Sequence, residues 1–236
     1  MKEILRSSVF GVMISLIAFE IGLLINKKTR KSFLNPLLIA MTIVILALKI
    51  FDISPQDYNK GGQIISFFLG PATVALAVPL FKNLAVLKKN ALPIIVGIFS
   101  GSIVSVISTI LFSKVFGLTD VLTLSLIPKS VTTPIGIEVS KQIGGVPEIT
   151  VAAIIVTGIT GAIMAQVIFS ALKIKDKIAM GIAIGTSAHA VGTSKAIEMG
   201  EIEGGMSGLS IGVAGLITVI IAPVIVKIFQ YLSVIK

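Results

Sequence analysis

The chain has 236 residues, of which 55% are hydrophobic and 13% charged, and its mean hydropathy is +1.05. So large an apolar excess excludes an ordinary soluble domain and predicts a polytopic membrane protein whose solvent is the lipid bilayer. The chain has no cysteine and one histidine, which excludes disulfides and thiol catalysis and leaves few ligands for a metal, so we expect neither a metal nor a cofactor.

The net charge of +9 arises mainly from short basic loops between apolar runs, without interleaved aromatic residues. This is the positive-inside pattern of membrane proteins, and we do not expect a nucleic-acid partner. The sequence also lacks a nucleophile elbow, a phosphate loop and metal-ligand spacing, so we do not expect an enzyme.

Four apolar runs predict ordinary spanning helices, at residues 8–25, 37–51, 64–81 and 92–112. The first begins with basic residues and has no small-x-small cleavage site, so we expect it to be retained. The third is interrupted at GPAT, which predicts a kink. The kink either packs against a neighbour or lines the cavity of a functional site through Gly70, Pro71 and Thr73.

The next segment, residues 122–145, reads LTLSLIPKSVTTPIGIEVSKQIGG. Pro128 predicts a break in the helix, and Pro134 suits the first turn of a new helix with Thr133 as its cap. A long apolar run follows at residues 149–172. This order of break, polar run and long helix is unlike a plain spanning segment.

A second segment of the same kind covers residues 178–199 and contains IAIGTSAHAVGTSK. We predict a break at Gly185 and a resumed helix capped by Thr193 and Ser194. An acidic exit with Glu198, Glu201 and Glu203 is expected to be a solvated loop, and a last apolar run follows at residues 209–226.

The two segments align at a constant offset of 57 residues, which places Pro128 on Gly185, Ser130 on Ser187 and Gly158 on Gly215. Three basic loops lie at residues 27–31, 82–89 and 173–177. If residues 122–145 crossed the membrane, these loops would lie on both sides of it, whereas a re-entrant hairpin places all three in the cytoplasm. Discontinuous helices in inverted repeats are common in secondary transporters.

We therefore predict an all-α membrane protein with about six spanning helices and two re-entrant or broken segments. The alternative has eight spanning helices and a parallel repeat. Residues 1–236 form a single membrane domain, in which residues 1–113 act as a scaffold and residues 121–236 contain the two repeats.

The breaks predict an anion site, because free amides at helix N-termini attract negative charge and Lys129 adds a cation. A small anionic metabolite with a carboxylate fits best. The candidate binding residues are Lys129, Ser130, Thr132, Thr133, Ser187, His189, Thr193 and Ser194. His189 is also the candidate for proton coupling.

Each of these residues has a plainer interpretation. Serine and threonine in membrane helices more often pack or cap than bind ligands. His189 is equally well explained as a hydrogen-bonded core histidine, although ionisable groups inside membranes are enriched in functional sites.

Several stretches resemble the LrgB/CidB (YohK) family. They are NPLLIA at 35–40, YNKGGQIISFFLGPATVALAVPL at 58–80, PKSVTTPIGIEVSKQIGG at 128–145 and GTSAHAVGTSKAIEMGEIEGGMSGLSIGVAG at 185–215. The resemblance covers nearly the whole chain. It implies a bacterial inner-membrane protein encoded with a smaller LrgA/CidA partner and associated with the control of murein hydrolases and autolysis. Relatives include the plastidial glycolate/glycerate translocator and bacterial proteins linked to pyruvate transport.

Two hypotheses result. The first is a secondary transporter of small monocarboxylates of the pyruvate, glycolate or glycerate class, coupled to protons through His189 and assembled as a homodimer. The alternative is a holin-like or antiholin-like protein that regulates murein hydrolase activity and autolysis.

Overall fold

The computed structural model describes residues 6–29, 34, 36–68, 71, 81 and 84–235, and within these ranges the regular structure is entirely helical. The chain forms two compact units, residues 1–75 and residues 76–236. This division by contacts differs from the division into scaffold and repeats near residue 113, which stays a prediction. Gly70 and Thr73 lie outside the described residues, and Pro71 is exposed.

The first unit contains α2 (Ser8–Thr29), α3 (Pro36–Ile50) and α4 (Pro55–Phe67). α2 and α4 approach closely where two glycines face each other, since a Cβ on Gly61 would lie 2.7 Å from the Cα of Gly11. The hydroxyls of Ser15 and Tyr58 are 2.8 Å apart at the same contact. Residues 55–63 were not predicted as a helix.

α4 begins at that point because Ser54 caps it and Pro55 follows in the first turn. The hydroxyl of Ser54 accepts a hydrogen bond from the amide of Asp57. Side-chain hydrogen bonds from Lys60, which has the largest effect, and from Ser54 hold the pKa of Asp57 below its usual value. Polar capping, rather than an apolar run, therefore sets the start of this helix.

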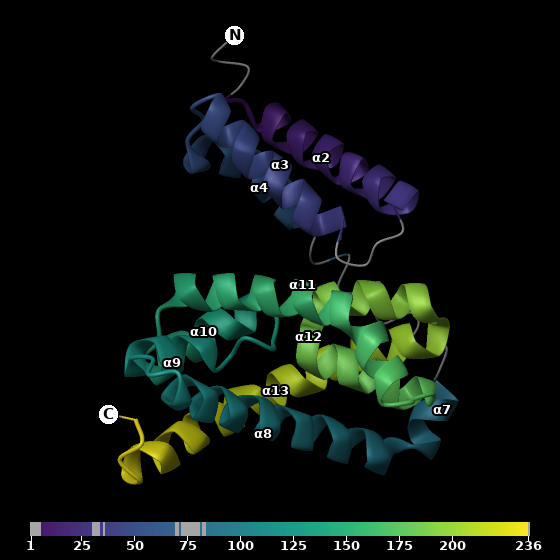
Figure 1. The fold of residues 1–236 in the computed structure, drawn as a ribbon, viewed down its shortest axis with the longest axis vertical. Helices are drawn as coiled ribbons and strands as arrows, with labels where there is room; N and C mark the ends of the chain where they lie inside the picture. Colours follow the sequence, from purple (N-terminus) through teal and green to yellow (C-terminus); the bar gives the residue numbers. More distant parts are fainter. Residues whose placement is uncertain are drawn as a thin grey trace. The chain divides into compact units, whose positions relative to one another are not determined.

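The second unit is built on three long helices, α8 (Ala91–Val115), α11 (Pro147–Ala171) and α13 (Glu201–Tyr231), and a short helix, α7 (Leu84–Lys89), precedes them (Figure 1). Together with α2, the described residues contain four helices long and apolar enough to cross a membrane, and α3 is a shorter apolar helix. About 20 apolar residues span the hydrocarbon core. The all-helical membrane fold is confirmed at this level.

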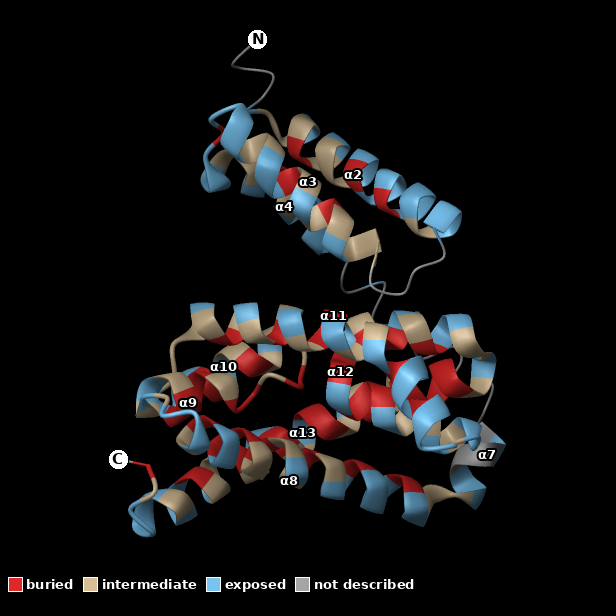
Figure 2. Cartoon of the chain, viewed as in Figure 1, coloured by how far each residue is buried: buried red, intermediate tan, exposed pale blue. Residues whose placement is uncertain are grey.

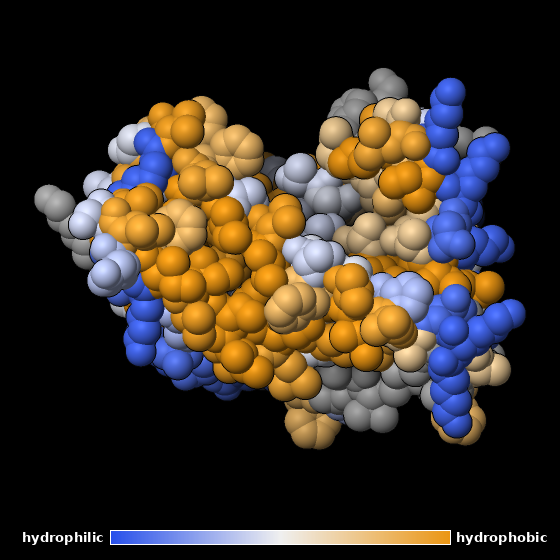
Figure 3. Space-filling view, turned by 90° about the horizontal axis from the view of Figure 1, so that it is seen from below, coloured by the Kyte–Doolittle hydropathy of each residue, from blue (hydrophilic) through white to orange (hydrophobic). Residues whose placement is uncertain are grey.

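The outer faces of these long helices are apolar and exposed, while the faces that meet are buried (Figure 2). Exposed residues include Leu92 and Phe99 of α8 and Leu216 and Ile220 of α13. In Figure 3 apolar residues cover the middle of the visible face and hydrophilic residues gather toward its ends. Such a surface is compatible with lipid and not with water.

The first broken segment forms a helical hairpin of α9 (Asp120–Leu126) and α10 (Thr133–Ile143). The two helices run antiparallel, since a Cβ on Gly145 would lie 2.9 Å from Ser125 and a Cβ on Gly136 would lie 3.4 Å from the carbonyl of Pro128. α10 ends at Gly144 in the left-handed conformation that favours glycine. The predicted break at Pro128 is confirmed, but the residue in the cap position is Thr132 and not Thr133.

Buried hydroxyls hold the base of this hairpin to α11. The hydroxyl of Thr150 is 2.7 Å from the carbonyl oxygen of Ser125 and 2.7 Å from the hydroxyl of Ser140. The amide of Val146 donates to the hydroxyl of Ser125 over 2.8 Å. Polar side chains inside an apolar unit are thus paired with one another and with the backbone ends of the hairpin.

The second broken segment, α12 (Lys177–Met199), is also a hairpin, because its backbone reverses at His189 (φ 41°, ψ −140°). After this reversal Gly192 packs against Ile184, and a Cβ on Gly192 would lie 2.9 Å from that side chain. In a straight helix these two residues would be about 12 Å apart along the axis.

The predicted break at Gly185 is therefore wrong. Gly185 lies inside the first arm of α12, where the absence of a side chain lets the backbone of Ser207 in α13 come close. The acidic exit is not a loop either. Glu201 and Glu203 lie in the first turn of α13, where carboxylates suit the helix dipole, and Glu203 is buried.

The two hairpins approach each other along α8 from its opposite ends. From the N-terminal end of α8, Ile182 faces Gly97 and Thr186 faces Gly101. The first hairpin begins at the C-terminal end of α8, where Lys114 pairs with Asp120, and the tip of this hairpin reaches the middle of α8 at Ser105. Both tips therefore lie midway along long apolar helices.

Candidate anion-binding site

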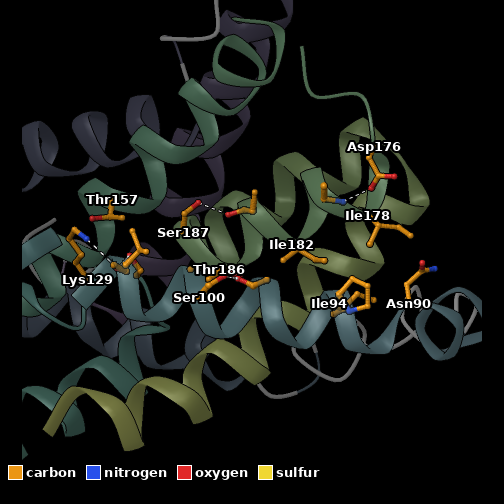
Figure 4. A pocket seen from close by; sticks show the side chains of 18 residues that line it. Asn90, Ile94, Ser100, Lys129, Thr157, Asp176, Ile178, Ile182, Thr186 and Ser187 are labelled. Carbon is orange, nitrogen blue, oxygen red and sulfur yellow. Dashed lines mark hydrogen bonds between the residues drawn. The ribbon is translucent and has the colours of Figure 1, made fainter. Parts of the chain in front are cut away.

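A cavity of about 900 Å³ lies between α8, α12 and the tip of the first hairpin. It reaches from Asn90 and Asp176 at one end of these helices to Lys129 and Thr157 near their middle (Figure 4). Apolar side chains such as Ile94, Ile178 and Ile182 form its walls, and hydroxyls gather toward the inner end. A mostly apolar pocket with a few convergent polar groups is the usual form of a small-molecule site.

Lys129 provides the positive charge at the inner end of the cavity. It follows Pro128 in the unwound tip, where its backbone amide donates a hydrogen bond to the carbonyl of Leu126. Its Nζ lies 3.5 Å from the hydroxyl of Ser105. The residue is half-buried, and within the described part of the chain no carboxylate pairs with it. An unpaired ammonium between apolar helices is costly unless an anion joins it.

Two further predicted residues line this cavity. Ser130 is buried and accepts a hydrogen bond from Ser105 over 3.0 Å, which leaves its own proton available. Ser187 donates its hydroxyl to the carbonyl of Ala183 over 2.6 Å. The structure thus brings Lys129 and Ser130 of the first hairpin together with Ser187 of the second around one cavity.

The other predicted residues lie elsewhere. Thr132 and Thr133 stand at the start of α10, and Ser194 is exposed. Thr193 is fully buried, where its hydroxyl donates to the carbonyl of His189 and lies 2.7 Å from the hydroxyl of Ser207. The resumed arm of α12 begins directly after His189, so Thr193 and Ser194 are not its caps.

His189 forms the tip of the second hairpin and packs against α11. Its Nε2 is 2.9 Å from the carbonyl oxygen of Ile154, and its ring lies over Gly158. The side chain is buried. It lines neither the large cavity nor a second, smaller cavity that adjoins the large one. Its role in proton coupling stays a prediction.

Sequence reasoning missed the contribution of α8 and α11 to the cavity. Ser100 and Ser105 of α8 and Thr157 of α11 line it, as does Thr186 of α12. The stretch SGSIVSVIST in α8 was the available signal, because its small and hydroxyl residues recur inside an apolar run. Such residues usually indicate helix packing, so the sequence did not single them out.

The four long apolar helices define a multi-pass membrane protein. The chain belongs to the LrgB-like family, whose model matches residues 15–228. This confirms the family resemblance of the four sequence stretches.

Similar proteins include the antiholin-like protein LrgB of Bacillus subtilis (strain 168), which is 41% identical over 227 residues, 96% of this chain and 98% of that protein. The antiholin-like protein LrgB of Bacillus cereus (strain B4264) is 40% identical over 215 residues, 91% of this chain and 94% of that protein. No solved structure matches the chain. These names agree with the antiholin-like alternative and do not mention transport.

Proposed function

We propose that this chain is a secondary transporter of small monocarboxylates in the bacterial inner membrane. The observation that supports this most directly is Lys129, which has no acidic partner among the described residues and stands at the inner end of a large cavity. Around it are hydroxyls that can donate to a carboxylate. Among the described residues that line the cavity, the only other charged one is Asp176, at the opposite end, where it caps α12. A single unpaired cation among these lining residues favours a ligand with one negative charge.

The arrangement of the hairpins supports a carrier. They reach the middle of the unit from opposite ends of α8, and each is followed by one long helix, as in transporters built from inverted repeats. The basic residues Lys88 and Lys175 lie near Asn90 and Asp176, which line the same end of the cavity. If that end is cytoplasmic, both hairpins are re-entrant, six helices span the membrane and the cavity opens inward.

Within this proposal the substrate is of the pyruvate, glycolate or glycerate class. His189 is the candidate for proton coupling, because its buried imidazole contacts the carbonyl of Ile154 in α11, and a movement of α11 would change this contact. A homodimer and a smaller LrgA-like membrane partner complete the proposed assembly.

The names of the relatives favour a second function, in which the chain acts as an antiholin-like regulator of murein hydrolases and autolysis. A holin-type assembly perturbs the bilayer and needs no enclosed site for a metabolite. The unpaired Lys129 in its cavity is unexplained by that mechanism alone. A regulatory protein that also binds a carboxylate would satisfy both observations.

Counterflow in proteoliposomes separates these functions. Vesicles that contain the purified chain and unlabelled pyruvate, glycolate or glycerate receive the labelled compound outside. We expect a transient accumulation of label that saturates with concentration, because a carrier exchanges one bound molecule for another. Protein-free vesicles are the control. Linear, non-saturable entry of every small solute would contradict the proposal and favour a pore.

A further inference from the structure

A second, much smaller cavity of about 10 Å³ lies directly behind the large one. This is about the space that one water molecule occupies. It is enclosed by the tip of the first hairpin, by α8 and by one residue each of α12 and α13. Of its nine lining residues five carry hydroxyls, namely Ser102, Ser105, Ser130, Thr186 and Thr218.

Two of these hydroxyls lack a partner. The residues Ser102 and Thr186 are only 3% and 7% exposed. The Oγ of Ser102 and the Oγ1 of Thr186 are buried, and neither makes a hydrogen bond within the described part of the chain. Buried hydroxyls are nearly always paired. Two that share one small cavity indicate a place for a hydrogen-bonding atom that the described residues do not supply.

The two cavities share three lining residues, Ser105, Ser130 and Thr186. Ser105 lies 3.5 Å from the ammonium of Lys129 and donates its hydroxyl to Ser130. The small cavity therefore lies at the positively charged end of the large one. No carboxylate is among the described residues that line it, so the local charge disfavours a metal cation and favours an atom with negative charge.

We propose that the small cavity receives one oxygen of the substrate's carboxylate, with Ser102 and Thr186 as hydrogen-bond donors and Lys129 as the counter-charge. This inference rests on the proposed function and extends it. Ser102 and Thr186 are binding residues that the sequence did not identify. An oxygen atom fits the space and can accept hydrogen bonds from both hydroxyls, whereas a methyl group in its place would leave both hydroxyls unpaired, so the site selects carboxylates over apolar isosteres.

The test uses Ser102→Ala and Thr186→Val, assayed by counterflow with whichever of pyruvate, glycolate and glycerate the wild-type chain exchanges fastest. Thr186→Val keeps the shape of the side chain, including the methyl group that faces Gly101. We expect each change to raise the KM roughly tenfold to hundredfold, because a hydrogen bond to a charged oxygen is lost. Thr186→Ser, which keeps the hydroxyl, is expected to raise the KM less than Thr186→Val does.

Ser108→Ala is the matched control. Ser108 lies on the same helix as Ser102, bonds the carbonyl of Ser105 and lines neither cavity. We expect its KM to equal that of the wild type. Because the hydroxyls of Ser102 and Thr186 have no hydrogen-bond partner among the described residues, their loss is expected to leave the thermal unfolding temperature unchanged or higher.

Three results would overturn the inference. An unchanged KM in both variants shows that the substrate does not reach the cavity. A lower unfolding temperature with an unchanged KM indicates a structural water. A changed dependence on external Na⁺, with the same KM for the carboxylate, indicates a cation site. If the wild-type chain still exchanges the carboxylate and this exchange depends on Lys129, the proposed transport function stands in each of these cases. If the wild-type chain exchanges no carboxylate, both the proposed function and this inference are wrong.

Discussion

Lys129 differs from three other lysines of the second unit in the groups that lie beside it. Lys114, Lys141 and Lys195 each pair with a carboxylate. Lys129 instead has hydroxyls beside it and a cavity in front of it. A residue that stabilised the fold would have its charge neutralised by the protein. Under the proposed function, the charge that neutralises Lys129 arrives with the ligand.

Replacing Lys129 with glutamine tests this directly. Since the ammonium has no acidic partner in the described part of the chain, we expect unchanged or higher thermal stability. Monocarboxylate exchange is expected to weaken by roughly tenfold to hundredfold in kcat/KM, because a charge-assisted hydrogen bond is worth ~1.5–3 kcal/mol. Counterflow and thermal unfolding in detergent measure the two quantities.

Lys195→Gln is the control for this substitution, since Lys195 pairs with Glu198 at the surface and lines neither cavity. Surface ion pairs contribute ~0–1 kcal/mol, and exchange should continue at the wild-type rate. Lys129→Gln that retained full exchange would exclude Lys129 from the site.

At this scale the sequence predicted the residues whose polarity conflicts with their surroundings. Lys129, Ser130 and Ser187 were chosen for that reason, and all three line the cavity. Ser102 and Ser105 could not be chosen, because one hydroxyl on an apolar helix resembles ordinary packing. Which face of α8 meets the hairpins depends on contacts far along the chain.

The two hairpins show why breaks in helices are unequally predictable. Pro128 and Pro134 mark the first, since proline removes an amide and the first turn of a helix tolerates that loss. The second reverses at His189, which has no local signal. Gly185 looked like the break, yet it provides close packing with α13. At the offset of 57 residues His189 falls on Thr132, the cap of α10, so the alignment contained a signal for the reversal that the prediction at Gly185 did not use.

The contact between the second hairpin and α11 depends on Gly158. A Cβ there would lie 2.6 Å from Cε1 and 2.8 Å from Nε2 of His189, whose ring is held by Ile154. We expect Gly158→Ala to destabilise the protein by ~1–3 kcal/mol, because the ring has no free space to move into. Thermal unfolding in detergent measures the effect.

Gly212→Ala is the matched control, since a Cβ at this exposed position of α13 meets nothing within 4 Å. Alanine is the better helix former, so its stability should be unchanged or higher by up to about 1 kcal/mol. Equal unfolding temperatures for the two variants would show that the hairpin tip does not press on α11.

The whole second unit has a charge asymmetry that fits its proposed orientation. Lys88 and Lys89 precede α8, Lys173 and Lys175 lie between α11 and α12, and Lys177 is the first residue of α12. Because the first arm of α12 runs beside α8 in the same direction, these two groups of lysines lie at the same end of the unit. At the other end Lys114 and Lys141 are paired with Asp120 and Glu138. The positive-inside bias then assigns the first end to the cytoplasm.

The absence of cysteine in this chain makes the orientation testable with single cysteines introduced by Phe116→Cys, Lys141→Cys, Lys88→Cys and Lys175→Cys. Phe116 and Lys141 flank the first hairpin, and both are exposed. If the hairpin is re-entrant, a membrane-impermeant maleimide labels both from the outer side, while Lys88→Cys and Lys175→Cys react only in inside-out vesicles. The unmodified chain, which has no thiol, controls for background labelling. If the segment crosses the membrane instead, Lys141→Cys reacts on the side opposite to Phe116→Cys and Lys175→Cys on the side opposite to Lys88→Cys. That outcome would contradict the re-entrant hairpin and favour the alternative with eight spanning helices, and the basic loops would then lie on both sides despite their charge.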